Sequence, residues 1–103
     1  MTGKDRILYD FLEQAKSDDR LLPSHLSVFT ALHHLLTQSE AENCVVITRK
    51  KIMQLAKIGS ISTYHRCMSD LTLFEYIIYK PSYDHYTGSL VIFECKSEAS
   101  RLR

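Results

Sequence analysis

Apolar residues recur along this chain at two spacings, one typical of helices and the other of strands. In four segments they return every three or four residues, which places them on one face of a helix. Three short runs of β-branched and aliphatic residues are typical of strands. In chain order, the predicted elements are helices over 5–16 and 24–36, a strand over 44–47, helices over 49–57 and 60–71, and strands over 76–80 and 90–95. The order α-α-β-α-α-β-β predicts an α+β fold.

Each predicted helix has an apolar face and a start or stop signal. The core candidates are Ile7, Leu8, Phe11, Leu12 and Ala15 in the first helix, Leu26, Phe29, Leu32, Leu35 and Leu36 in the second, Ile52, Met53, Leu55 and Ala56 in the third, and Tyr64, Met68 and Leu71 in the fourth. Ser24, Thr48 and Ser60 are predicted N-caps, because hydroxyl oxygens accept from the free N–H groups at helix starts. Gly59 is predicted to take the positive φ that ends the third helix.

The two short helices over 49–71 are the centre of the predicted fold. The second of them has Ser62, His65, Arg66 and Ser69 on the side opposite its apolar stripe. A bracing helix joined to one that presents polar side chains is the arrangement of helix-turn-helix units. The stretch SISTYHRCMSDL over 60–71, followed by FEYI over 74–77, resembles the recognition helix and first wing strand of winged helix-turn-helix DNA-binding domains. Many members have Gly where this chain has Glu75, which favours a differently built turn before the wing.

The longer stretch 57–89, with YKPSYDHYTGS as its wing, is similar to small winged-helix proteins carried by conjugative elements of gut anaerobes. The resemblance implies a winged helix with an extra N-terminal helix. A recognition helix over about 60–74 would enter the major groove, and a wing over about 81–89 would touch the adjacent minor groove. We expect one domain over 1–103, made of a helix and charged break over 1–20, a winged-helix core over 21–95 and a flexible tail over 96–103.

Composition limits the class of protein. With 103 residues and 45% hydrophobic content, the chain is long enough for one modest core and too apolar for a disordered protein. No apolar run approaches the length of a membrane span, and 1–16 lacks the layout of a signal peptide, so we expect a cytoplasmic protein without membrane association. Cys44, Cys67 and Cys95 are odd in number and far apart, which predicts reduced cysteines.

The sequence contains no motif of an enzyme, a metal site or a cofactor site. A Gly-rich phosphate loop and a nucleophile elbow are both missing. Cys67 and His65 lie two residues apart, so they point to different sides of a helix and do not form a dyad. His33 and His34 have no carboxylate or thiol at ligand spacing. We therefore expect no catalytic activity, no metal and no cofactor.

Basic residues concentrate in the helix pair. No acidic residue occurs over 43–69, and this segment contains Arg49, Lys50, Lys51, Lys57 and Arg66. The formal charge is −3 over residues 1–42 and −1 over residues 70–103. A basic segment that coincides with a predicted helix pair favours a phosphate-binding face over a chance cluster on a solvated surface.

The predicted DNA-binding residues come from the helix pair and the wing. They are Thr48, Arg49, Lys50, Lys51, Ser60, Ser62, Thr63, His65, Arg66, Ser69, Lys80, Tyr83, His85 and Tyr86. Arg66 could instead form an i, i+4 ion pair with Asp70, and His65 could be a neutral surface residue. Tyr64 is assigned to the core rather than to base stacking. Tyr83 and Tyr86 either reach the sugar-phosphate backbone or pack on the base of the wing.

The sequence therefore predicts a protein that binds double-stranded DNA sequence-specifically, with transcriptional regulation as the favoured use. An accessory role in replication or excision of a mobile element would use the same face. A winged helix used only for protein–protein contact is the alternative from another class.

The first helix predicts a weak homodimer. One recognition helix reads too few base pairs to be selective, so winged-helix regulators commonly pair. The contact would use Ile7, Leu8, Phe11 and Leu12, with Tyr9 at its flank. The same stripe could instead pack against the second helix of its own chain.

Overall fold

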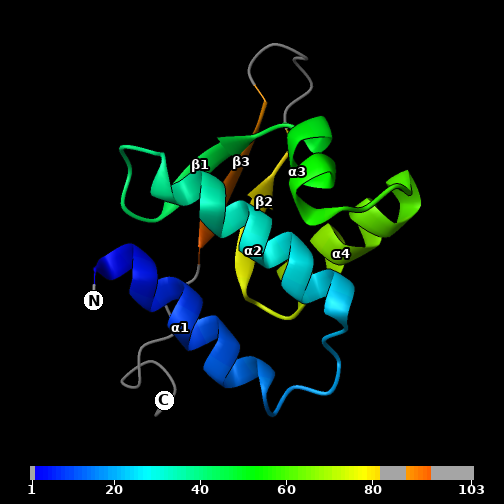
Figure 1. Cartoon of the computed structure of the whole chain (residues 1–103), viewed down its shortest axis with the longest axis horizontal. Coiled ribbons are helices and arrows are strands. Elements are labelled where there is room, and N and C mark those ends of the chain that lie inside the picture. The colour runs from blue at the N-terminus through cyan, green and yellow to red at the C-terminus, as the bar shows by residue number, and fades with distance from the viewer. Residues whose placement is uncertain (1, 82–87, 94–103) are drawn as a thin grey trace.

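The computed structural model describes residues 2–81 and 88–93 of the chain. Over these residues it has a mixed α+β architecture (Figure 1). The elements are α1 (Gly3–Ala15), α2 (Pro23–Thr37), β1 (Cys44–Ile47), α3 (Arg49–Ala56), α4 (Ile61–Leu73), β2 (Ile77–Lys80) and β3 (Ser89–Phe93). The predicted α+β class and the order α-α-β-α-α-β-β are confirmed, and no boundary differs from the predicted one by more than two residues.

The three strands form an antiparallel sheet in the order β1-β3-β2. Burial alternates along the strands, as the pleat requires. The inward-facing, buried positions are Val45, Ile47, Ile77, Val91 and Phe93. This inner face packs against α2, which lies in front of the sheet in Figure 1, while α3 and α4 lie to the right.

A row of aromatic side chains joins α1 to the sheet through α2. Phe11 stacks on Phe29 with 3.7 Å between ring centroids, and Phe29 meets Phe93 edge to face at 5.4 Å. Phe11 and Ile7 are thus buried in the core of their own chain. Of the other residues predicted for the dimer contact, Leu8 is half-buried, and Leu12 and the flanking Tyr9 are exposed.

The predicted N-caps Thr48 and Ser60 are confirmed, and Ser24 is wrong. The Thr48 hydroxyl accepts from the Lys51 N–H at 3.3 Å, and the Ser60 hydroxyl accepts from the Thr63 N–H at 3.2 Å. Helix α2 instead begins at Pro23, with Leu22 in the cap position. Proline is favoured at the first helical position because it has no N–H to satisfy and its φ is already helical, so the cap moves one residue before it.

The prediction that Gly59 ends the third helix with a positive φ is wrong, because Lys57 takes this conformation at φ 60°. Directly after it, Ile58 donates from its N–H to the Met53 carbonyl at 3.0 Å and packs on the core. This is a Schellman motif, in which the residue after the left-handed position makes an apolar contact with the helix. A left-handed residue at Gly59 would carry Ile58 away from that contact.

Helix α4 ends in the same motif, with Glu75 at φ 67°. Tyr76 donates from its N–H to the Leu71 carbonyl at 2.9 Å, and Glu75 donates to the Thr72 carbonyl at 3.1 Å. The turn before β2 therefore has the backbone conformation that Gly adopts freely, although the residue is Glu. The differently built turn expected from Glu75 is not found.

We predict that Glu75→Gly raises the free energy of unfolding by up to about 1 kcal/mol, because it removes the steric cost of a Cβ at positive φ. The greater chain entropy of glycine in the unfolded state offsets part of this gain. Urea unfolding measures the change. Glu75→Ala keeps the Cβ and is the control, with little expected change. Equal effects of the two substitutions would show that the side-chain charge, and not the backbone conformation, matters at this position.

Candidate nucleic-acid interface

Helix α4 is buried on one side and open on the other. Tyr64, Met68 and Leu71 are buried, as predicted, and Cys67 joins them. On the opposite side Ser62, His65, Arg66 and Ser69 are exposed, and Thr63 is half-buried. The polar residues chosen from the helical spacing thus occupy one continuous surface of this helix.

The first turn of α4 uses two of the predicted residues for its own stability. The Ser60 hydroxyl caps the helix and lies 3.0 Å from the Ser62 hydroxyl. Ser60 therefore acts mainly as a cap. Ser62 is exposed but shares this contact, and His65, Arg66 and Ser69 are the exposed hydrogen-bonding groups beyond it.

Ile61 is an exposed residue of this surface that helical spacing alone does not indicate. Ile61 lies three residues before Tyr64, so helical spacing places it on the same side as the buried stripe. It is, however, the first residue of α4 and lies beyond the edge of the core. An exposed aliphatic side chain at the start of such a helix can contact the methyl group of thymine in a major groove.

The basic residues of the helix pair are all exposed. Arg49, Lys50 and Lys51 form the first turn of α3, Lys57 follows its end, and Arg66 lies on α4. The ion pairs among the described residues involve Arg6, Lys16, Arg20 and His25, and none of these five cations. Three cations at a helix N-terminus, where the helix dipole is also positive, make a favourable position for a phosphate.

Arg49 also lies close to the buried side of α4. Burial raises the pKa of the Tyr64 hydroxyl well above its usual range, the neighbouring Tyr79 adds to the rise, and the charge of Arg49 opposes it.

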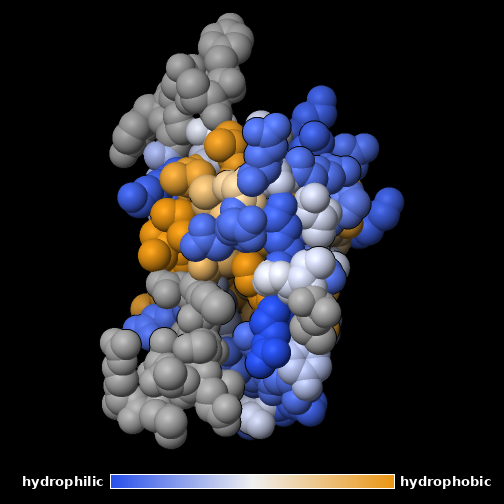
Figure 2. All heavy atoms as spheres, turned by 90° about the vertical axis from the view of Figure 1, so that its left-hand side faces the viewer, coloured by the Kyte–Doolittle hydropathy of each residue, from blue (hydrophilic) through white to orange (hydrophobic). Residues whose placement is uncertain are grey.

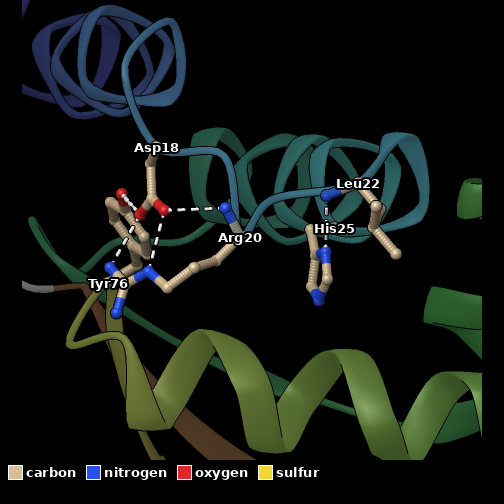
Figure 3. Close-up of polar contacts among 5 residues, drawn as sticks. All are labelled: Asp18, Arg20, Leu22, His25 and Tyr76. Atoms are coloured by element: carbon tan, nitrogen blue, oxygen red, sulfur yellow. Dashed lines mark hydrogen bonds and ion pairs between the residues drawn. The ribbon is translucent and has the colours of Figure 1, made fainter.

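The alternative partner for Arg66, Asp70, is engaged elsewhere. Its carboxylate oxygen lies 2.9 Å from Nε2 of His25, whose side chain is only 1% exposed. The other ring nitrogen of His25, Nδ1, accepts from the Leu22 N–H at 2.8 Å (Figure 3). A ring that accepts at Nδ1 carries its proton on Nε2, so His25 donates to Asp70 as a neutral imidazole. This contact ties α4 to the start of α2.

A second polar cluster holds the far end of α4 (Figure 3). The Arg20 guanidinium donates twice to the Asp18 carboxylate, from Nε and Nη2, each at 2.8 Å. The Tyr76 hydroxyl donates to the same carboxylate at 2.5 Å, and Arg20 lies over the Phe74 ring at 4.1 Å from its centroid. The linker between α1 and α2 is thereby fastened to the turn between α4 and β2.

This cluster shifts the pKa values of its members. The hydrogen bonds from Arg20, the largest cause, and from Tyr76 hold the pKa of the Asp18 carboxyl well below its usual range. Burial and the bond to Asp18 raise the pKa of the Tyr76 hydroxyl to about 12. At neutral pH the cluster therefore consists of a carboxylate, a guanidinium and a protonated phenol.

The base of the predicted wing is only partly within the described residues. Lys80 is exposed at the end of β2, whereas Tyr83, His85 and Tyr86 lie outside them. Gly88 has φ 73°, and a Cβ at this position would come within 2.8 Å of the Ile47 carbonyl oxygen. This glycine lets the chain pass close to β1 at the point where β3 begins.

The His and Cys side chains that could serve as metal ligands have other surroundings. His33 is buried, with Nε2 placed 2.8 Å from the Lys4 carbonyl oxygen. Cys67 is buried and Cys44 half-buried, both as free thiols, and Cys95 is outside the described part of the chain. Within that part, no three His, Cys, Asp or Glu side chains are placed to hold a metal ion.

Comparison with family models, with curated proteins and with solved structures found no match to this chain. In the described residues, no helix combines the length and the apolar character needed to cross a membrane.

We predict that Asp18→Asn lowers the free energy of unfolding at pH 7 by about 1–3 kcal/mol, the range for a charge-assisted hydrogen bond. Because the pKa of Asp18 is lower in the folded chain, its contribution is present above its unfolded pKa, near 4, and is lost as the pH falls through the folded value. Thermal unfolding between pH 7 and pH 2 measures this.

The variant should therefore lose less stability on acidification than the wild type. Asp19→Asn, at the exposed neighbouring position, is the control and should follow the wild-type curve. An acid limb of the Asp18→Asn curve parallel to that of the wild type would contradict the role of this carboxylate.

Proposed function

We propose that this chain is a winged helix-turn-helix protein that binds double-stranded DNA sequence-specifically and regulates transcription. The observation that carries the proposal is the exposed polar side of α4 together with the exposed cations of the first turn of α3, in a segment, residues 43–69, without acidic residues. The element order and the three-stranded antiparallel sheet are compatible with this fold. The segment between β2 and β3 would be its wing.

In the proposed complex, α4 enters the major groove. His65, Arg66 and Ser69 reach base edges, and Ile61 lies against a thymine methyl group. Arg49, Lys50 and Lys51 hold the phosphate backbone on one side of the groove. Lys80 and the wing contact the adjacent minor groove.

This arrangement separates positioning from sequence readout. Phosphate contacts supply affinity and register for any sequence, whereas contacts to base edges distinguish one sequence from another. The buried contacts of His25 and Asp70 matter here because a recognition helix that tilts loses several base contacts together.

Selection of bound sequences from a random DNA pool by the full chain tests the proposal. An enriched motif supports a sequence-specific DNA-binding protein. Binding without an enriched motif favours an accessory role in replication or excision, which uses the same face. No retained DNA would leave protein–protein contact as the use of this fold.

We predict that the affinity for DNA falls steeply with salt. The basic face offers about five or six phosphate contacts, so the logarithm of the binding constant should change with the logarithm of salt concentration with a slope of roughly −4 to −6. Fluorescence anisotropy titrations at several salt concentrations give this slope. A flat response would remove the phosphate-binding role of α3 and α4.

We also predict different effects for Arg66→Ala and Lys50→Ala. If Arg66 reads a guanine edge, its loss should weaken binding to the selected sequence by about 1–3 kcal/mol and relax specificity at one position. Lys50→Ala should weaken binding to selected and random sequences about equally. The same sequence-independent loss from both variants would reduce Arg66 to a phosphate contact.

A further inference from the structure

The turn between α3 and α4 has a lysine where its backbone favours a glycine. Lys57 has φ 60°, and its N–H donates to the Met53 carbonyl oxygen, so it is the left-handed residue that ends α3. A Cβ is disfavoured in this conformation, whereas glycine adopts it freely. The backbone conformation therefore does not explain why this residue is lysine.

The glycine of this turn lies two residues later, where the fold does not require it. Gly59 does not have a positive φ. Apart from its chain neighbours, no atom of the described residues lies within 4 Å of the place that a Cβ at Gly59 would occupy. Replacing such a glycine by alanine normally stabilises a fold, because it lowers the entropy of the unfolded chain. The stability of the turn therefore favours neither Lys57 nor Gly59.

Both residues belong to an exposed, basic stretch that leads into α4. Lys57 and Gly59 are exposed, while Ile58 between them packs on the core. No acidic residue occurs over 43–69, and the ion pairs among the described residues do not include Lys57. An exposed ammonium group beside a backbone position without a side chain is an arrangement that an anion can approach closely.

We propose that the turn over 57–59 is a phosphate contact of this protein with DNA. The Lys57 ammonium group binds a phosphate oxygen, and the missing side chain at Gly59 lets the sugar-phosphate backbone come close to the turn. The contact rests on the proposed function, DNA binding, and gives a role in it to two residues that the fold does not explain. Residues that are kept for binding at a cost in stability are common at functional sites.

The position of the turn agrees with this role. It joins α3, whose first turn carries Arg49, Lys50 and Lys51, to α4, whose exposed side carries His65 and Arg66. Figure 2 shows the left-hand side of Figure 1, where hydrophobic residues gather, whereas α3, α4 and the turn between them lie on the right. DNA that binds at the turn would therefore not lie against this apolar area.

Urea unfolding and fluorescence anisotropy titrations with DNA, both on the full chain, test the proposal. Lys57→Gln keeps the Cβ and removes the charge, whereas Lys57→Gly removes both. Each should lower the affinity for DNA about five- to tenfold at about 0.1 M salt and make the salt slope less steep by about one, the change for one lost phosphate contact. Lys57→Gly should nevertheless unfold at a higher urea concentration than Lys57→Gln, because it removes the Cβ at positive φ.

Gly59→Ala tests the second residue without changing a charge. Its midpoint of unfolding should rise, whereas its affinity for DNA should fall severalfold with an unchanged salt slope. Glu75→Gly is the matched control, because it makes the same backbone change at the left-handed residue after α4. It should unfold at a higher urea concentration than the wild type without a loss of affinity.

The outcomes for this contact and for the proposed function are distinguishable. If the wild type binds DNA and either Lys57→Gln or Gly59→Ala binds it equally tightly, the phosphate contact is overturned and the proposed function stands. A loss of affinity by Glu75→Gly as large as that by Lys57→Gly also overturns the contact, because the effect would then come from the backbone change. A wild type that binds no DNA overturns both.

Discussion

Burial of the stripe formed by Tyr64, Cys67, Met68 and Leu71 decides which side of α4 reaches solvent. These side chains belong to the core that α4 shares with α2 and β2. Because Ser62, His65, Arg66 and Ser69 lie on the opposite side of the helix, they stay exposed whenever the stripe is buried. The exposed polar surface is thus a consequence of core packing. Any chemistry proposed for this surface depends on the same hydrophobic contacts that stabilise the domain.

Apolar packing alone leaves a helix some freedom to slide or tilt, and polar contacts at two places restrict α4. His25 fastens Asp70 to the start of α2, and Asp18 fastens Tyr76, just beyond the end of α4, to the linker before α2. Both contacts are directional and lie at the edge of the core, where a lost partner would leave a buried polar group unsatisfied. They hold α4 in one position relative to α2, against which α3 also packs.

The sequence was sufficient for features that depend on local spacing, and insufficient where tertiary contacts decide. The order of elements, the buried stripe of α4 and the caps Thr48 and Ser60 follow from periodicity and side-chain chemistry. The left-handed residue after α3 was misplaced at Gly59, because its true position depends on where Ile58 meets the core. The bond between His25 and Asp70 joins residues 45 positions apart and has no local signature. The exposure of Ile61 was also not predictable from helical spacing, because it depends on where the core ends.

In the sheet, burial alternates from residue to residue, but hydrophobicity does not. Burial alternates along β1 and β3, but Cys44–Ile47 and 90–93 are apolar at every position, which is typical of strands covered on both faces. Within the described residues, helices pack on the inner face of the sheet alone, so Val46 and Ile78 remain exposed on the outer face.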